Sequence, residues 1–117
     1  MSLHLTPEMI EAAYDLLRTT PPIKRWRLPE ADDVVFRVVR DDFCGSFRYD
    51  EKGVPTMSIS AKRVGKLQTL IEVVAHEMVH MKEDSEGLSR ADVQHSARFK
   101  RLAAQVCRHH GFDEKTF

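Results

Sequence analysis

The sequence predicts one α+β domain with an N-terminal helix, a small three-stranded antiparallel sheet and two further helices. Apolar residues recur at the three- and four-residue spacing of a helix near both ends of the chain, and at the two-residue spacing of strands in between. The 117 residues suffice for one hydrophobic core, and no linker-like stretch divides them. Residues 1–117 are therefore expected to form a single domain.

The first helix is expected to follow Thr6. The Thr6 hydroxyl can cap the first free amides, and Pro7 fits the first helical turn. The apolar face has helical spacing and consists of Ile10, Ala13, Tyr14 and Leu17. Residues 19–22 contain two prolines and should end the helix. Residues 24–27 should then form a short exposed basic loop with the Trp26 side chain tucked in.

Three segments in the middle of the chain, residues 34–40, 43–49 and 54–60, have the alternation and the β-branched and aromatic content of strands. Short turns rich in Asp and Gly separate them, which predicts an antiparallel meander. The third segment alternates polar and apolar residues. Pro55 has no amide hydrogen to donate to a neighbouring strand, so it fits an edge strand better than a central one. We therefore expect the third strand to be a half-exposed edge strand.

Two helices are predicted in the second half of the chain. The first spans residues 66–82 and has a core-facing stripe of Leu67, Leu70, Ile71, Val74, Met78 and Met81. The second follows residues 89–92, which resemble a capping arrangement, and ends at Gly111, which suits a left-handed helix terminator. Between them, the acidic residues 83–87 are expected to form an exposed loop.

Composition argues against several classes of protein. Eighteen basic residues balance eighteen acidic ones, so no overall field attracts nucleic acid. No apolar run approaches the ~20 residues that cross a bilayer, and the first residues lack the pattern of a secretory signal. These features predict a cytoplasmic protein without a membrane partner. Cys44 and Cys107 are too few for a disulfide framework and are expected to be reduced thiols.

The candidate functional site is the motif HEMVH at residues 76–80, within the predicted helix 66–82. Two histidines four residues apart lie one turn apart on a helix and can direct imidazole nitrogens at one ion. Glu77 is rotated by about 100° from His76, which in HExxH sites brings the carboxylate beside the metal-bound water. The motif therefore predicts a Zn²⁺ site in which Glu77 is the catalytic acid/base of a hydrolysis.

A catalytic zinc site needs a third protein ligand. The metzincin pattern fails because Glu83 and Glu86 stand at its Gly and His positions, and Phe99 excludes the thermolysin pattern. His95 is the expected ligand, at the start of the last helix and on the same apolar stripe as Phe99, facing the preceding helix. Glu83, Glu86 and Asp92 stay open as alternatives, although acids in exposed loops are more often solvated.

Residues 76–80, the acidic loop and the segment HSARF at residues 95–99 together resemble the SprT-like metallopeptidases, which include bacterial SprT and the eukaryotic Spartan proteases. Their HExxH motif is followed by a His-Gly-x-x-Phe element, in which Ser96 replaces the glycine here. The resemblance implies a zincin-like core, expected here in a minimal form without the zinc ribbon that members often carry. It also implies a protein or peptide substrate, and Glu77 as the acid/base. The zinc ligands that it implies are His76, His80 and His95.

Two other interpretations stay open. One is a DNA-associated zinc module with a basic rim of Lys62, Arg63, Lys66, Arg98, Lys100, Arg101 and Arg108. The other is an inactive zinc scaffold, against which Glu77 argues because a structural site needs no general base. For a peptidase, we expect the extended substrate to add alongside residues 56–60. The oxyanion donor is open among Arg48, Tyr49 and the final histidines, residues 109–110.

Overall fold

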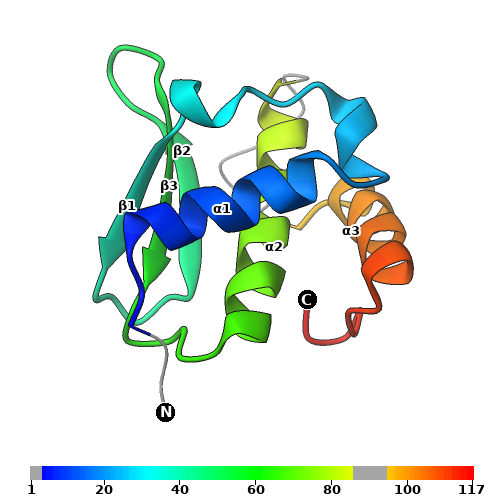
Figure 1. The fold of residues 1–117 in the computed structure, drawn as a ribbon. Coiled ribbons are helices and arrows are strands. Elements are labelled where there is room, and N and C mark those ends of the chain that lie inside the picture. Colours follow the sequence, from blue (N-terminus) through cyan, green and yellow to red (C-terminus); the bar gives the residue numbers. More distant parts are fainter. Residues whose placement is uncertain (1–3, 86–94) are drawn as a thin grey trace.

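The structure is a computed structural model that describes residues 4–85 and 95–117. It is an α+β fold with three helices and one three-stranded sheet, so the predicted fold class is confirmed (Figure 1). The elements in chain order are α1 (Pro7–Arg18), β1 (Val35–Val39), β2 (Gly45–Tyr49), β3 (Pro55–Ser60), α2 (Leu67–Ser85) and α3 (Ala97–His110). Two short 3-10 turns, Ile23–Trp26 and Ala31–Asp33, connect α1 to β1.

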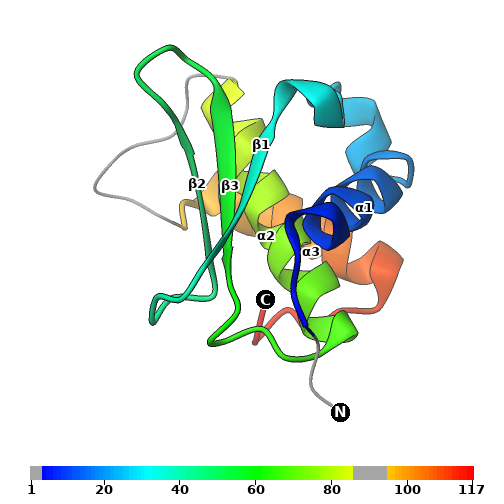
Figure 2. The same ribbon diagram turned by 60° about the vertical axis from the view of Figure 1, so that its left-hand side comes forward.

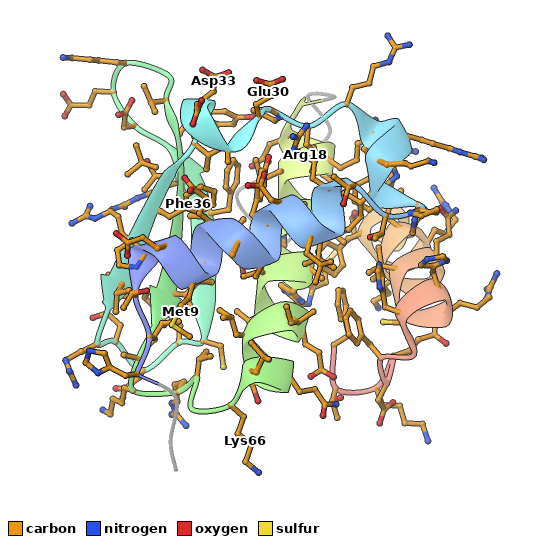
Figure 3. The ribbon with its side chains drawn as sticks, viewed as in Figure 1. Met9, Arg18, Glu30, Asp33, Phe36 and Lys66 are labelled. Carbon is orange, nitrogen blue, oxygen red and sulfur yellow. The ribbon has the colours of Figure 1, made fainter. Side chains whose placement is uncertain are left out.

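Helix α1 begins and ends as its sequence predicts. The Thr6 hydroxyl accepts a hydrogen bond from the Met9 amide at 3.3 Å, which caps the helix. All four residues of the predicted apolar face are buried. Tyr14, on that face, donates its hydroxyl to the Pro29 carbonyl at 2.6 Å, and its ring meets that of Phe36 edge-on, with centroids 5.3 Å apart. Phe36 is labelled in Figure 3, where it lies next to α1. Helix α1 is thereby fastened to β1.

The sheet has the strand order β1-β3-β2, in which β1 runs parallel to β3 and β2 runs antiparallel to it (Figure 2). The predicted hairpin of β2 and β3 is confirmed. The predicted antiparallel meander is wrong, because β3 lies between the other two strands and its pairing with β1 is parallel. Residues 40–44 carry the chain past the end of β3. Hydrogen bonds from the Ser60 amide to the Cys44 carbonyl at 2.9 Å, and from the Ala61 amide to the Val39 carbonyl at 2.8 Å, fix this crossing.

The central position of β3 follows from its burial. Residues 56–60 are all buried, with Met57 and Ile59 fully enclosed, whereas β1 and β2 have no fully buried position. A strand this buried gains most from a neighbour on each side, so the prediction of a half-exposed edge strand is wrong. Pro55 is tolerated because it is the first residue of the strand, where a missing amide costs little.

Helix α2 is the centre of the molecule. It lies between the sheet and α3, and α1 crosses it (Figures 1 and 2). Its buried anchors include four of the six residues predicted for its apolar stripe, namely Leu70, Val74, Met78 and Met81. Leu67 departs from that prediction, with 63% of its surface exposed at the first residue of the helix. The side of α2 that does not carry this stripe faces β2 and α3.

The ends of the last two helices differ from the prediction. Helix α2 continues to residue 85, so Glu83 and Asp84 belong to it rather than to a loop. Helix α3 is capped by Ser96, whose hydroxyl accepts from the Phe99 amide at 3.1 Å. The cap predicted at residues 89–92 lies outside the described residues. Gly111 ends α3 with φ 77° and ψ 23°, the predicted left-handed conformation. No helix within the described residues is long and apolar enough to cross a membrane.

Candidate metal centre

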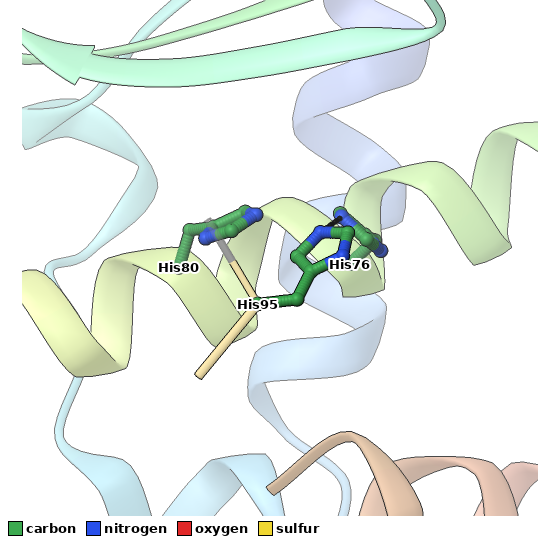
Figure 4. A group of neighbouring side chains, drawn as sticks. All are labelled: His76, His80 and His95. Atoms are coloured by element: carbon green, nitrogen blue, oxygen red, sulfur yellow. Dashed lines mark hydrogen bonds between the residues drawn. The ribbon is translucent and has the colours of Figure 1, made fainter. Parts of the chain in front are cut away.

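Helix α2 brings the two histidines of the HEMVH motif to one side. His76 and His80 are one turn apart and partly buried, and their ring centroids are 5.0 Å from each other (Figure 4). The buried neighbours Val74, Ala75 and Val79 fix the rotation of the helix against the core. The motif therefore has the helical placement that its spacing predicts.

His95 reaches the same point from the segment before α3. Its Nε2 lies 3.2 Å from Nε2 of His76, and its ring centroid is 5.4 Å from that of His80. Ligand atoms of the three histidines all lie within 4.8 Å of one another (Figure 4). Two nitrogens bound to one ion at about 2 Å in tetrahedral geometry are separated by about 3.3 Å. The three histidines can therefore hold one metal ion.

The setting of His95 differs from the prediction in one respect. It precedes the cap Ser96, so it is not part of α3, and it is exposed rather than enclosed by the preceding helix. Because Ser96 is the cap, α3 begins at Ala97, two residues after His95, and His95 does not share the helical stripe. Its ring nevertheless stacks on Phe99, with centroids 4.5 Å apart and planes 20° apart.

Phe99 is the common support of the three histidines. Its ring is 3% exposed and lies 5.0 Å from that of His76, 4.5 Å from that of His80 and 4.5 Å from that of His95, between centroids. Sequence analysis interpreted Phe99 as a core residue of the last helix, which is confirmed. Its contact with all three imidazoles also restricts the orientations that they can take.

Burial sets the protonation of the two α2 histidines. Burial, and then the proximity of His80 and His95, lowers the pKa of His76 to about 4, while a backbone hydrogen bond with Phe117 acts in the opposite direction. Burial, and then the proximity of His95, also lowers the pKa of His80 to about 4. Both imidazoles are consequently neutral at pH 7, which is the form that binds metal.

Glu77 lies beside this cluster and lines the same cleft as His76 and His80. Its side chain is 5% exposed, and burial raises the pKa of its carboxyl to about 8. A carboxyl with this pKa is mostly protonated at pH 7 and exchanges its proton close to neutral pH. A cation at the three histidines would favour the ionised form instead.

The cleft at the cluster has a volume of about 560 Å³ and lies between α2 and the start of β2. Its lining residues are Cys44, Gly45, Ser46, Phe47, Thr69, Glu72, Val73, His76, Glu77, His80, Asp84, His95, Thr116 and Phe117. Glu72 and Asp84 lie one turn before His76 and one turn after His80. Among the described residues, no Lys or Arg lines the cleft.

Close packing of β2 on α2 sets the width of the cleft. A Cβ atom added to Gly45 would lie 2.8 Å from Cγ1 of Val73 and 3.0 Å from Cδ1 of Ile59. Only glycine allows this approach without a shift of its neighbours. Sequence analysis did not single out Gly45, because the partner across a strand–helix contact is visible only in the fold.

Several other predicted candidates lie away from the cluster. Glu83 is buried in α2 and is bonded to Ser96, so it is neither a solvated loop acid nor part of the histidine group. The alternative ligands Glu86 and Asp92 lie outside the described residues. None of the four residues considered as oxyanion donors lines the cleft. One of them, His110, has its Nε2 3.2 Å from the Thr20 hydroxyl instead.

The last residues of the chain form a wall that sequence analysis missed. The Phe117 ring lies 5.4 Å from that of His76 and 6.0 Å from that of Phe112, between centroids. The Phe117 amide donates to the Asp113 carbonyl at 3.0 Å, which turns the segment back toward the cleft. A single aromatic residue at this position carries no spacing signal by which it could have been found.

The chain was also compared with known proteins. No protein-family model matches it, and a search of curated proteins finds no match. The predicted resemblance to SprT-like metallopeptidases therefore stays a prediction, and the candidate metal centre stands on the geometry of His76, His80 and His95.

Proposed function

We propose that this protein is a zinc-dependent hydrolase that cleaves peptide bonds. The observation that carries the proposal is the convergence of three histidines within 4.8 Å, beside a buried glutamate, in an open cleft. Neutral imidazole is a common zinc ligand, and three protein ligands leave one coordination position for reaction, as in catalytic rather than structural sites. The resemblance of residues 76–80 and 95–99 to SprT-like metallopeptidases supports the same function.

In this mechanism, His76, His80 and His95 would hold the ion. Bound zinc supplies a Lewis acid that polarises the substrate carbonyl and acidifies water. Glu77 takes a proton from the attacking water and returns it to the leaving amine. Burial raises the pKa of the Glu77 carboxyl and a nearby cation would lower it, so in the loaded site the carboxylate could accept a proton and return it near neutral pH.

A polypeptide suits this cleft better than a nucleic acid. Three acidic side chains, Glu72, Glu77 and Asp84, line it, and no Lys or Arg does so among the described residues, so a phosphate backbone would meet repulsion there. None of the seven residues of the predicted basic rim lines the cleft, and Lys62 instead forms an ion pair with Asp42. The interpretation as a DNA-associated module therefore gains no support from the cleft.

The place where an extended peptide could pair changes with the sheet order. Residues 56–60 cannot receive it, because β3 has a neighbour on each side. Strand β2 pairs only with β3 among the described residues, and residues 45–47 of β2 line the cleft. A substrate strand along the free edge of β2 would bring its carbonyls toward the histidines.

The test combines metal analysis with hydrolysis of an unstructured protein by the wild type, Glu77→Gln and His95→Ala, with and without single-stranded DNA. We expect one zinc per wild-type chain, weaker binding in His95→Ala, and bound zinc without hydrolysis in Glu77→Gln. Glu72→Gln is the matched control, because it removes a cleft carboxylate from the same helix and should keep activity. Equal hydrolysis by wild type and Glu77→Gln would reject the mechanism. Zinc binding without hydrolysis of any substrate would favour the inactive scaffold.

A further inference from the structure

Glu83 is a buried acid outside the proposed mechanism. Its side chain is 3% exposed although it lies in the last turn of α2, close to the end of the described segment. Burial of a carboxylate is costly unless a donor compensates it. The Ser96 hydroxyl donates to Oε2 of Glu83 at 2.6 Å, the short distance typical of a hydrogen bond to a charged oxygen.

Ser96 uses both capacities of its hydroxyl. It donates to Glu83, and it accepts from the Phe99 amide at 3.1 Å as the cap of α3. One side chain therefore fixes the start of α3 and ties it to the end of α2. This contact joins two points that are thirteen residues apart in the sequence.

His95 is the residue that this tie places. It directly precedes Ser96, belongs to no helix or strand, and is more exposed than the two histidines of α2. Its backbone position depends on where α3 begins and on how that start is held against α2. Its ring also stacks on that of Phe99, three residues beyond Ser96, and contacts the rings of His76 and His80.

We propose that Glu83 and Ser96 form a positioning pair that holds His95 at the metal centre. The pair does not touch the ion or the substrate, and it acts by keeping the third ligand within reach of His76 and His80. This inference rests on the metal centre of the proposed function but not on hydrolysis. Outer partners that orient a ligand commonly change metal affinity by about 10–100-fold when removed.

The test measures zinc affinity by competition with a chromogenic chelator for wild type, Ser96→Ala and Ser96→Thr. We expect about 10-fold or greater loss in Ser96→Ala and rescue to within about twofold in Ser96→Thr, which keeps the hydroxyl. Thr6→Ala is the matched control, because it removes the same kind of helix cap from α1, away from the cleft. It should lower stability without changing zinc affinity.

A double-mutant cycle distinguishes positioning from general loss of structure. In a His95→Ala background, Ser96→Ala should change zinc affinity by less than about twofold, because the ligand that it positions is already gone. Glu83→Gln supplies a second variant that keeps the size of the side chain, and it should weaken zinc binding in the same direction. The absorption spectrum with Co²⁺ in Ser96→Ala should shift toward that of His95→Ala.

The outcomes separate the two proposals. Undiminished zinc affinity in Ser96→Ala, or an equal loss with and without His95, would overturn the positioning pair while the metal centre stands. Failure of the wild type to bind zinc would overturn the metal centre and the pair with it. Zinc binding with the expected cycle, but without peptide hydrolysis, would support the pair and reject only the hydrolase.

Discussion

Replacing Glu77 by Gln should stabilise the protein in the presence of EDTA, and it should abolish the proposed hydrolysis. The reason is the burial that raises the pKa of Glu77 from its usual 4.5 to about 8. Between these two values the unfolded chain gives up the proton more readily than the folded one. The contribution of Glu77 to the free energy of unfolding is therefore largest below pH 4.5, and it is lost as the pH rises toward 8. A glutamine keeps the shape of the side chain and removes the titration.

The magnitude follows from the same values. At pH 7 the solution is about 2.5 pH units above the ordinary pKa of the carboxyl, and about 1.4 kcal/mol for each unit gives a cost of about 3 kcal/mol. At pH 7 the free energy of unfolding of Glu77→Gln should exceed that of the wild type by an amount of this order. For a domain of 117 residues this corresponds to a rise of roughly 10 °C in Tm.

The assay is urea denaturation with EDTA at pH 5.0, 6.5 and 8.0 for wild type, Glu77→Gln and the control Glu72→Gln. The advantage of Glu77→Gln should grow with pH, by about 1.5 kcal/mol between pH 6.5 and 8.0. Glu72→Gln removes a half-buried acid of the same helix and should stay within about 0.5 kcal/mol of wild type. The reasoning is refuted if the wild type and Glu77→Gln show the same stability at all three pH values.

Three further predictions concern the walls and the histidines of the cleft. Gly45→Ala should lower the free energy of unfolding by about 1–3 kcal/mol, because the added Cβ meets Val73 at 2.8 Å; Gly65→Ala, with open space around it, is the control in urea denaturation. Phe99→Leu should keep the fold but weaken zinc binding at least several-fold in chelator competition, and unchanged affinity would contradict its role as a support. In Glu77→Gln with EDTA, unfolding free energy should fall by about 2–4 kcal/mol from pH 6.5 to 4.5, because the two α2 histidines have folded pKa values of about 4 and unfolded values of 6.5. A flat profile over that range would contradict this assignment.

Local signals made the helices predictable. Thr6 and Pro7 mark the start of α1, Gly111 marks the end of α3, and helical spacing gave the buried face of each. The pairing of His76 with His80 needed only the geometry of one helix turn. These features depend on residues that are close in sequence, and the structure confirms them.

The sheet order and the wall residues were not predictable in the same way. A two-residue period shows which side chains share a face, but it does not say which strand lies beside which. The alternation that suggested an edge for β3 arises from Thr56, Ser58 and Ser60, which are polar yet buried. Phe117 contacts His76 through the tertiary fold alone.

Glu83 illustrates how burial overrides composition. An acidic run between two helices usually indicates a solvated loop, and no Gly or Pro marks the true end of α2 before residue 86. The helix instead extends over Glu83, whose carboxyl is compensated by Ser96. Ser96 is thirteen residues after Glu83, so the sequence of α2 alone could not reveal the hydrogen bond between them.

The most direct test of the account is native mass spectrometry of the protein titrated with zinc at pH 7, beside the variant in which His76, His80 and His95 are all alanine. We predict one tightly bound zinc per wild-type chain and none in the triple variant, because these three side chains supply the ligand atoms that converge within 4.8 Å. Equal zinc binding by the two proteins, or no binding by the wild type, would contradict the assignment of this cluster as the metal centre.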